Sequence, residues 1–245
     1  MNLGLAVVRV GAVEGRYLEA TGDTEAGQTV HVGEAYALAL HEEWSERVCA
    51  SCFAVREQRL SHVCGYCERT FYCSSECRKK HRTMGAAGSV PHHLVCPGLA
   101  ALGPIEENNT LVQARLLLEV LARRHGMRPD TQAKRAADEL AGLQHQRRPT
   151  SCANASELRW CDGVRVAVAA CGWGADVAVK DVSDEALLEL VSRFEINGFD
   201  CIFSAAPDQS AGTAIHLGVA LHAACGSMRM RHVHCRYPLH PHPTW

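Results

Sequence analysis

The chain has 245 residues, a length that fits one large domain or two modest ones, and its apolar content of 47% is ample for a buried core. Its 25 basic and 27 acidic residues give a formal net charge of −2, which argues against a protein that binds nucleic acid through overall charge. No run of about 18 apolar residues is present and no basic region begins the chain, so the sequence predicts neither a membrane span nor a secretory signal.

The first 45 residues are expected to form short strands joined by glycine turns. Residues 3–10 are apolar and partly alternating, 16–20 fit a second short strand, and 28–40 are β-branched and then apolar. Gly11 and Gly15 lie between the first two segments and predict a turn there.

A series of paired metal-ligating residues follows these strands. It comprises Cys49, Cys52, Cys64, Cys67, Cys73, Cys77, His92 and Cys96. Two ligands separated by two residues can hold one tetrahedral ion, so the four pairs suffice for two closed zinc sites, which are structural rather than catalytic. This spacing favours zinc thiolates in a reducing, intracellular compartment, nucleus or cytoplasm, over a disulfide scaffold.

In zinc modules of this kind the first and third pairs often share one ion, and the second and fourth share the other. One predicted site is therefore Cys49, Cys52, Cys73 and Cys77, and the second is Cys64, Cys67, His92 and Cys96. A sequential arrangement of the pairs and free thiols are the alternatives. His93 also has a workable spacing, but His92 is preferred as the histidine ligand. The six cysteines outside the series are expected to be small buried residues.

Helical patterns follow within and beyond the series. Ser74 fits the N-cap of a short helix, and the basic run 78–82 on that helix is expected to be a solvated face rather than a nucleic-acid contact. An apolar stripe predicts a helix from residue 110 to Gly126, and Asp130 and Ser183 are expected to cap two more. Residues 164–179 fit no single type, 197–199 predict a turn, and 201–204 predict a short strand.

The spacing of the paired ligands, with Phe71 and Tyr72 before the third pair and a basic helix after it, resembles a MYND zinc finger. The connection between Cys77 and His92 is longer than is usual in that family, which costs little because loop-closure entropy grows slowly with length. Fingers of this family usually bind short proline-containing peptides, so the resemblance implies protein or peptide partners.

The flanks resemble a SET domain. Residues 15–20 and 25–30 look like its opening strands and glycine turns, and 197–199 and 215–221 resemble the point where its core resumes. A SET domain split by a MYND finger is the layout of the SMYD family of protein-lysine methyltransferases. The resemblance implies S-adenosylmethionine as cofactor, with Gly15, Arg16 and Asn197 as cofactor-binding residues.

The sequence departs from the family after Leu221. The expected Asn-His-x-Cys motif, the catalytic tyrosine on a strand and the cysteine-rich segment after the SET core are not found, so no catalytic residue is assigned. We therefore expect a chain impaired in catalysis, and a truncated or misread coding sequence is one hypothesis for it.

The expected fold is α+β, a short-strand SET fragment interrupted by a small two-zinc MYND finger and a helical insert. The expected parts are an N-terminal SET fragment (1–48), the finger (49–96), a helical connecting region (97–195), an incomplete resumed SET core (196–221) and a disordered tail (222–245). The functional hypothesis is a zinc-binding relative of S-adenosylmethionine-dependent lysine methyltransferases. The alternative is a non-catalytic adaptor that binds proline-containing peptides.

Overall fold

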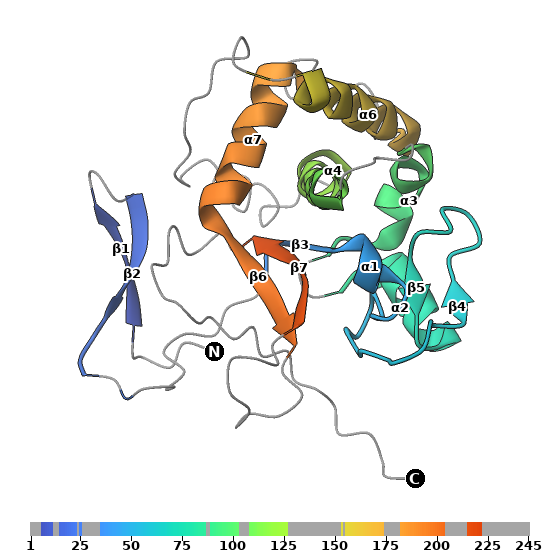
Figure 1. Cartoon of the computed structure of the whole chain (residues 1–245), viewed down its shortest axis with the longest axis horizontal. Helices are drawn as coiled ribbons and strands as arrows, with labels where there is room; N and C mark the ends of the chain where they lie inside the picture. Colours follow the sequence, from blue (N-terminus) through green and yellow to red (C-terminus); the bar gives the residue numbers. More distant parts are fainter. Residues whose placement is uncertain are drawn as a thin grey trace.

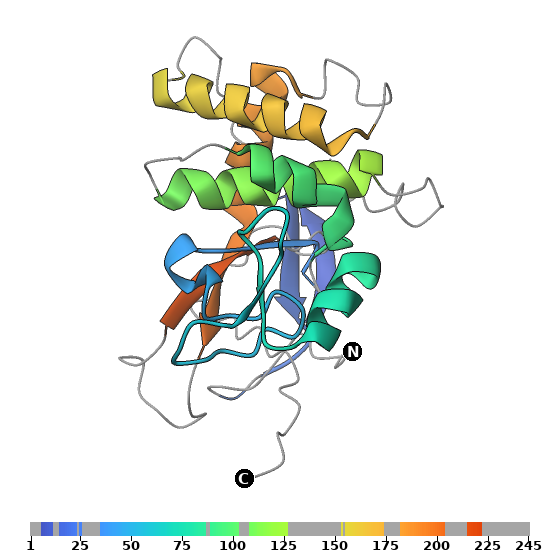
Figure 2. The ribbon, with the colours of Figure 1, turned by 90° about the vertical axis from the view of Figure 1, so that its right-hand side faces the viewer.

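The structure is a computed structural model that describes residues 6–11, 15–23, 25, 35–86, 89–102, 108–126, 153, 155–173, 182–203 and 215–221. The helices stack above a layer that holds a small sheet and the cysteine-rich segment (Figures 1 and 2). Short strands and longer helices occur together in one chain, so the predicted α+β class is confirmed.

Two N-terminal strands pair with each other. Strands β1 (Ala6–Gly11) and β2 (Gly15–Ala20) are antiparallel, with Ala6 opposite Ala20 and Gly11 opposite Gly15. Both strands predicted before residue 21 are therefore present, and Gly11 and Gly15 flank the connection between them. The next predicted strand is described only at its end, as β3 (Ala37–Leu40).

The second sheet pairs a strand that precedes the cysteine series with strands that follow the last helix. Its strand order is β3, β7 (Ile215–Leu221) and β6 (Gly198–Phe203), with antiparallel neighbours throughout. Leu40 lies opposite Gly218, although everything from the cysteine series to the last helix separates them in sequence. The paired cysteines and the helices are therefore an insertion between strands of one sheet.

The start of β6 differs from the sequence prediction. Residues 197–199 were expected to form a turn, but helix α7 (Asp184–Asn197) runs directly into β6. Gly198 pairs with Leu221, so the pairing of β6 with β7 begins as soon as the helix ends. This pairing outweighs the local preference of residues 197–199 for a turn. The predicted helix after Asp130 and the predicted disordered tail lie outside the described residues.

Short elements frame the cysteine-rich segment. They are α1 (Glu42–Ser45), β4 (His62–Val63), β5 (Phe71–Tyr72) and α2 (Ser75–Met84). The predicted N-cap of α2 is confirmed, because Ser74 accepts a hydrogen bond from the Cys77 backbone N–H at 3.1 Å. The helix ends at Gly85, whose φ of 74° is accessible to glycine at little cost.

Among the described residues, four helices and a π-helical turn make the upper part of the molecule. They are α3 (His92–Ala101), α4 (Asn108–Leu121) with its π-helical extension (Ala122–Gly126), α6 (Ala155–Cys171) and α7. Helix α4 lies at the centre of Figure 1, where α3, α6, α7 and β3 surround it. It is buried on nearly all sides, with 0–1% exposure at Leu116, Leu117, Leu118, Val120 and Leu121.

Helix α3 packs against α6 through a glycine. A Cβ atom built on Gly98 would lie 2.8 Å from the backbone oxygen of Ala167 and 2.6 Å from the Cys171 Sγ atom. The Ala167 carbonyl is part of the α6 backbone and is held in its helix. Gly98 therefore sets how closely α3 approaches α6.

Replacing Gly98 with alanine should lower the free energy of unfolding by about 1–3 kcal/mol, because the added methyl group forces the two helices apart. Gly163→Ala on α6 is the matched control, since no heavy atom lies within 4 Å of its would-be Cβ. This control should gain about 0.5–1 kcal/mol from helix propensity alone. Urea unfolding gives the free energy of unfolding of both variants. If Gly98→Ala stabilised the protein as much as Gly163→Ala, this would contradict the close approach at Gly98.

Candidate metal centres

One cluster of four thiols lies where the first and third cysteine pairs meet. Cys49 and Cys52 lie on the turn after α1, Cys73 follows β5, and Cys77 lies in the first turn of α2. The Cys52 and Cys73 Sγ atoms are 3.6 Å apart, as are those of Cys73 and Cys77. All four ligand atoms lie within 4.8 Å of one another.

A second cluster joins the second and fourth pairs. Cys64 and Cys67 lie on the turn after β4, and His92 and Cys96 lie one turn apart at the start of α3, so their side chains leave the same face of the helix. The Cys64 and Cys96 Sγ atoms are 3.5 Å apart, and Cys67 Sγ lies 3.6 Å from His92 Nε2. These four ligand atoms also lie within 4.8 Å of one another.

The distances within both clusters fit a tetrahedral zinc ion. Bonds of about 2.3 Å to sulfur and 2.0–2.1 Å to nitrogen place ligand atoms about 3.8 Å apart for two sulfurs and about 3.6 Å apart for sulfur and nitrogen. A disulfide would need about 2.05 Å. Each cluster supplies four ligands, so the chain fits two Zn²⁺ ions in closed, structural sites, with the pairs interleaved as the spacing predicts.

The two Cys-x-x-Cys turns repeat one backbone conformation. The N–H of Phe53 donates to the carbonyl oxygen of Cys49 at 2.8 Å, and the N–H of Glu68 donates to that of Cys64 at 3.0 Å. Phe53 and Glu68 have φ values of 56° and 55°, which cost a residue with a side chain of order 1–3 kcal/mol. Such strain persists only where the surroundings enforce it, and an ion that closes each pair would do so.

The structure separates the two adjacent histidines. His92 is buried with its Nε2 atom in the second cluster, whereas the exposed His93 turns its Nδ1 atom to the carbonyl oxygen of Arg82 at 2.7 Å. The imidazole of His93 is therefore directed away from the cluster.

Ionisation in the second cluster suits a cation. Hydrogen bonding to His92 lowers the pKa of Cys64 to about 5, against an opposing effect of burial. Burial lowers the pKa of His92, but hydrogen bonds to the thiolates of Cys64, Cys67 and Cys96 outweigh it and raise that pKa to about 11. Zn²⁺ would take the place of the His92 proton, so that thiolates and a neutral imidazole hold the ion.

His81 supports the second cluster from α2. The basic run 78–82 was expected to be a solvated face, and this is correct for its lysines and arginines but wrong for His81, which is 4% exposed. Its ring stacks on His92 with centroids 5.6 Å apart. Burial, with the charge of His92, lowers the pKa of His81 to about 3, so its imidazole is neutral.

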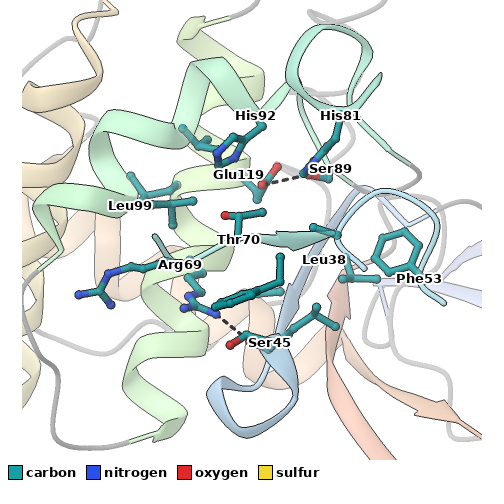
Figure 3. A pocket seen from close by; sticks show the side chains of 17 residues that line it. Leu38, Ser45, Phe53, Arg69, Thr70, His81, Ser89, His92, Leu99 and Glu119 are labelled. Carbon is teal, nitrogen blue, oxygen red and sulfur yellow. Dashed lines mark hydrogen bonds between the residues drawn. The ribbon is translucent and has the colours of Figure 1, made fainter. Parts of the chain in front are cut away.

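A directed chain of hydrogen bonds runs from the finger to α4. The carboxylate of Glu119 only accepts, so the Ser89 hydroxyl donates to its Oε1 atom at 3.1 Å (Figure 3). His81 Nε2–H then donates to Ser89 Oγ at 3.1 Å, and the hydroxyl of Tyr72 donates to His81 Nδ1 at 3.2 Å. Glu119 also accepts from the Val90 backbone N–H at 2.8 Å. The segment before His92 is thereby fixed to the central helix.

A cavity of about 80 Å³ lies where β3, the finger, α3 and α4 meet (Figure 3). Ser45, Thr70, Arg115 and Glu119 are among the polar residues that line it. Sites for drug-sized ligands are usually about 300–1,000 Å³, so this cavity is too small for a nucleoside cofactor.

The residues expected to bind a cofactor lie on a strand and at the end of a helix. Gly15 and Arg16 begin β2, opposite Gly11 and Val10, and Asn197 ends α7 just before β6. The β1–β2 pair and the sheet that contains β6 are not joined by strand pairing. The role of these three residues remains a prediction.

Comparison with known proteins places these clusters in a family. The family model of the MYND finger matches residues 49–96, the segment that contains all eight ligand atoms. The clusters and this match define the segment as a MYND-type zinc finger. Among the described residues no helix is both long and apolar enough to cross a membrane.

Two curated relatives are both named "N-lysine methyltransferase SMYD2". The chain is 33% identical over 110 residues to that of Sus scrofa, covering 45% of this chain and 23% of the relative. It is 33% identical over 112 residues to that of Mus musculus, covering 46% and 23%. The chain thus spans about a quarter of the length of these relatives. Over these residues the chain is similar to proteins of the SET and MYND (SMYD) type.

The buried Glu119 should give the protein a characteristic pH dependence. Burial raises its pKa from an ordinary value near 4.5 to about 7, against opposing effects of Val90, Ser89, Arg123 and His92. Between these two values the folded state binds more protons than the unfolded state, so this contribution to stability falls as the pH rises, by at most about 1.4 kcal/mol per pH unit.

Glu119→Gln removes the titrating group and should abolish this contribution. Unfolding free energies are measured from pH 5 to pH 8 with zinc in excess, and the wild-type value is expected to fall relative to the variant up to about pH 7. Taking the difference cancels the pH dependence of zinc binding, which both proteins share. Parallel pH profiles would show that Glu119 does not titrate in this window.

Proposed function

We propose that the finger binds two structural zinc ions and presents a surface to protein partners. The ligands of the first ion are Cys49, Cys52, Cys73 and Cys77, and those of the second are Cys64, Cys67, His92 and Cys96. The observation that carries this proposal is the pair of interleaved clusters whose interatomic distances match tetrahedral zinc. Both clusters are closed, so the metal organises the segment and performs no chemistry.

Partner binding is supported by the finger's family and by its surface. MYND fingers usually bind proline-containing peptides, and we propose that class of partner. Tyr66, between the cysteines of the second turn, is 68% exposed, and Met84 at the end of α2 is 74% exposed. Both side chains offer exposed apolar area to a partner.

A relation to lysine methyltransferases is the second part of the proposal. The relatives' names and the sheet that the finger interrupts both support it. Within this framework Gly15, Arg16 and Asn197 are the proposed contacts to S-adenosylmethionine. We propose that this chain is impaired in catalysis, since the residues after Leu221 contain no Asn-His-x-Cys motif, and an adaptor role is the alternative to enzymatic turnover.

The proposed organisation has an N-terminal SET fragment over 1–48 and the finger over 49–96. A helical connecting region covers 97–195, and the SET core resumes over 196–221. Thiolate ligands need reducing conditions, which supports a location in the nucleus or cytoplasm.

Metal analysis of the purified protein should give two zinc ions per chain. Cys73→Ala and Cys64→Ala should each retain one, because each removes a ligand from a different cluster. Cys64→Ala should also cost more stability, since Cys67 and Cys96 belong to the main hydrophobic core while Cys73 packs against a smaller cluster. Cys161→Ala, a buried thiol outside both clusters, is the control and should keep both ions. One ion or none in the wild type would refute the ligand assignment.

Calorimetry separates the two functional hypotheses. Proline-containing peptides titrated into the zinc-loaded chain should release heat, and Cys73→Ala should lose this binding because the first zinc holds α2. S-adenosylmethionine is titrated into the same protein, and no heat even at high concentration would favour the adaptor. Micromolar affinity for S-adenosylmethionine without peptide binding would instead favour the enzyme.

A further inference from the structure

The two metal clusters differ in their surroundings. In the second cluster Cys67, His92 and Cys96 are 4–8% exposed, while Cys64 is half-buried and packs against the main core. In the first cluster only Cys49 is buried, within a small separate group that includes Leu60 and Phe71. Cys73 and Cys77 are half-buried, and Cys52 is exposed to solvent.

The first cluster is also the more electron-rich. Four thiolates around Zn²⁺ carry a net charge of −2, whereas three thiolates and a neutral imidazole carry −1. Oxidation of a cysteine requires thiolate character and access, and sensitive cysteines often have a second thiol close by. Cys52 meets these conditions, because it is an exposed ligand whose Sγ atom lies 3.6 Å from that of Cys73.

We propose that the first cluster is a redox-sensitive zinc site, in which Cys52 is the thiolate oxidised first and Cys73 is its resolving partner. This inference rests on the two-zinc assignment proposed above. The oxidant class is a hydroperoxide, with hydrogen peroxide as the simplest member. The second cluster keeps its ion longer under the same conditions, because the sulfurs of Cys67 and Cys96 are buried and none of its ligands is exposed as Cys52 is.

The chemistry balances without a further reactant. The Cys52 thiolate attacks one peroxide oxygen, the O–O bond breaks, hydroxide leaves, and Cys52 becomes a sulfenic acid. The Cys73 thiolate then attacks the Cys52 sulfur, the S–S bond forms, and the S–O bond breaks with loss of a second hydroxide. Two thiolates are oxidised by two electrons in total, hydrogen peroxide is reduced to two hydroxides, and Zn²⁺ leaves a site that has lost two ligands.

The structural consequence is confined to one side of the finger. Cys77 lies in the first turn of α2, so loss of the first ion releases that turn and the turn that carries Cys52. His92 and Cys96 stay in the first turn of α3 and remain attached to the core. Oxidation would thus loosen the outer part of the finger and leave the helices folded.

The test treats the full chain with hydrogen peroxide and follows zinc release with a chromogenic chelator. Samples taken during the reaction are alkylated, digested and read by mass spectrometry. The first zinc equivalent should leave well before the second, together with a Cys52–Cys73 disulfide, while peptides that contain Cys64 and Cys96 stay reduced. Cys52→His keeps four ligands but removes the first thiolate, so its early phase of release should be lost. Cys161→Ala should behave as wild type.

Release of both ions together, a first disulfide within the second cluster, or Cys52 still reduced after the first ion has left would each overturn the inference. The peptide map of the wild-type protein decides this even if Cys52→His fails to hold zinc. Fewer than two ions before the oxidant is added would instead refute the two-zinc assignment itself, so the two failures are distinguishable.

Discussion

The first turn of α3 is the constraint on which the rest of the molecule depends. It supplies His92 and Cys96 to the second cluster, while the same helix packs on α6 through Gly98. Because this turn carries metal ligands and is also part of a core helix, zinc binding at the second cluster stabilises more than the finger. Binding of structural zinc contributes about 10–16 kcal/mol. The stacked ring of His81 and the bonds of Glu119 hold this turn from the other side.

The sheet imposes a second constraint, because its order β3-β7-β6 joins segments far apart in sequence. Such pairing must wait until the intervening chain is compact, since closing a long loop costs entropy before the ladder compensates for it. Helix α4 packs against β3 and also contacts β7, and the ion pair of Arg115 with Glu42 ties it to α1 beside that sheet. The insertion therefore folds as support for the sheet that it interrupts.

Local chemistry made part of this structure predictable from sequence. The cysteine spacing identified the four pairs, and their interleaved grouping followed from what zinc modules of this kind often do. The caps at Ser74 and Ser183 depend only on neighbours three residues away. Helix α3 was not predicted, because its short span contains Pro97 and Gly98 and has no clear apolar stripe. Glu119 and the buried His81 were also missed, since their roles come from partners brought close only by folding. Residues 197–199 end α7 and begin β6 instead of forming the expected turn, because folding brings the pairing partner β7 close.

The sheet order also bears on how such a chain can change over time. Leu40 and Cys201 both lie opposite Gly218, so the strands that flank the insertion are two strand spacings apart, about 10 Å. An insertion that leaves and rejoins one sheet on strands this close together can lengthen, shorten or diverge without altering their register. The finger and helices can therefore acquire new binding properties by mutation while the sheet keeps its geometry, which separates the evolution of recognition from that of the scaffold.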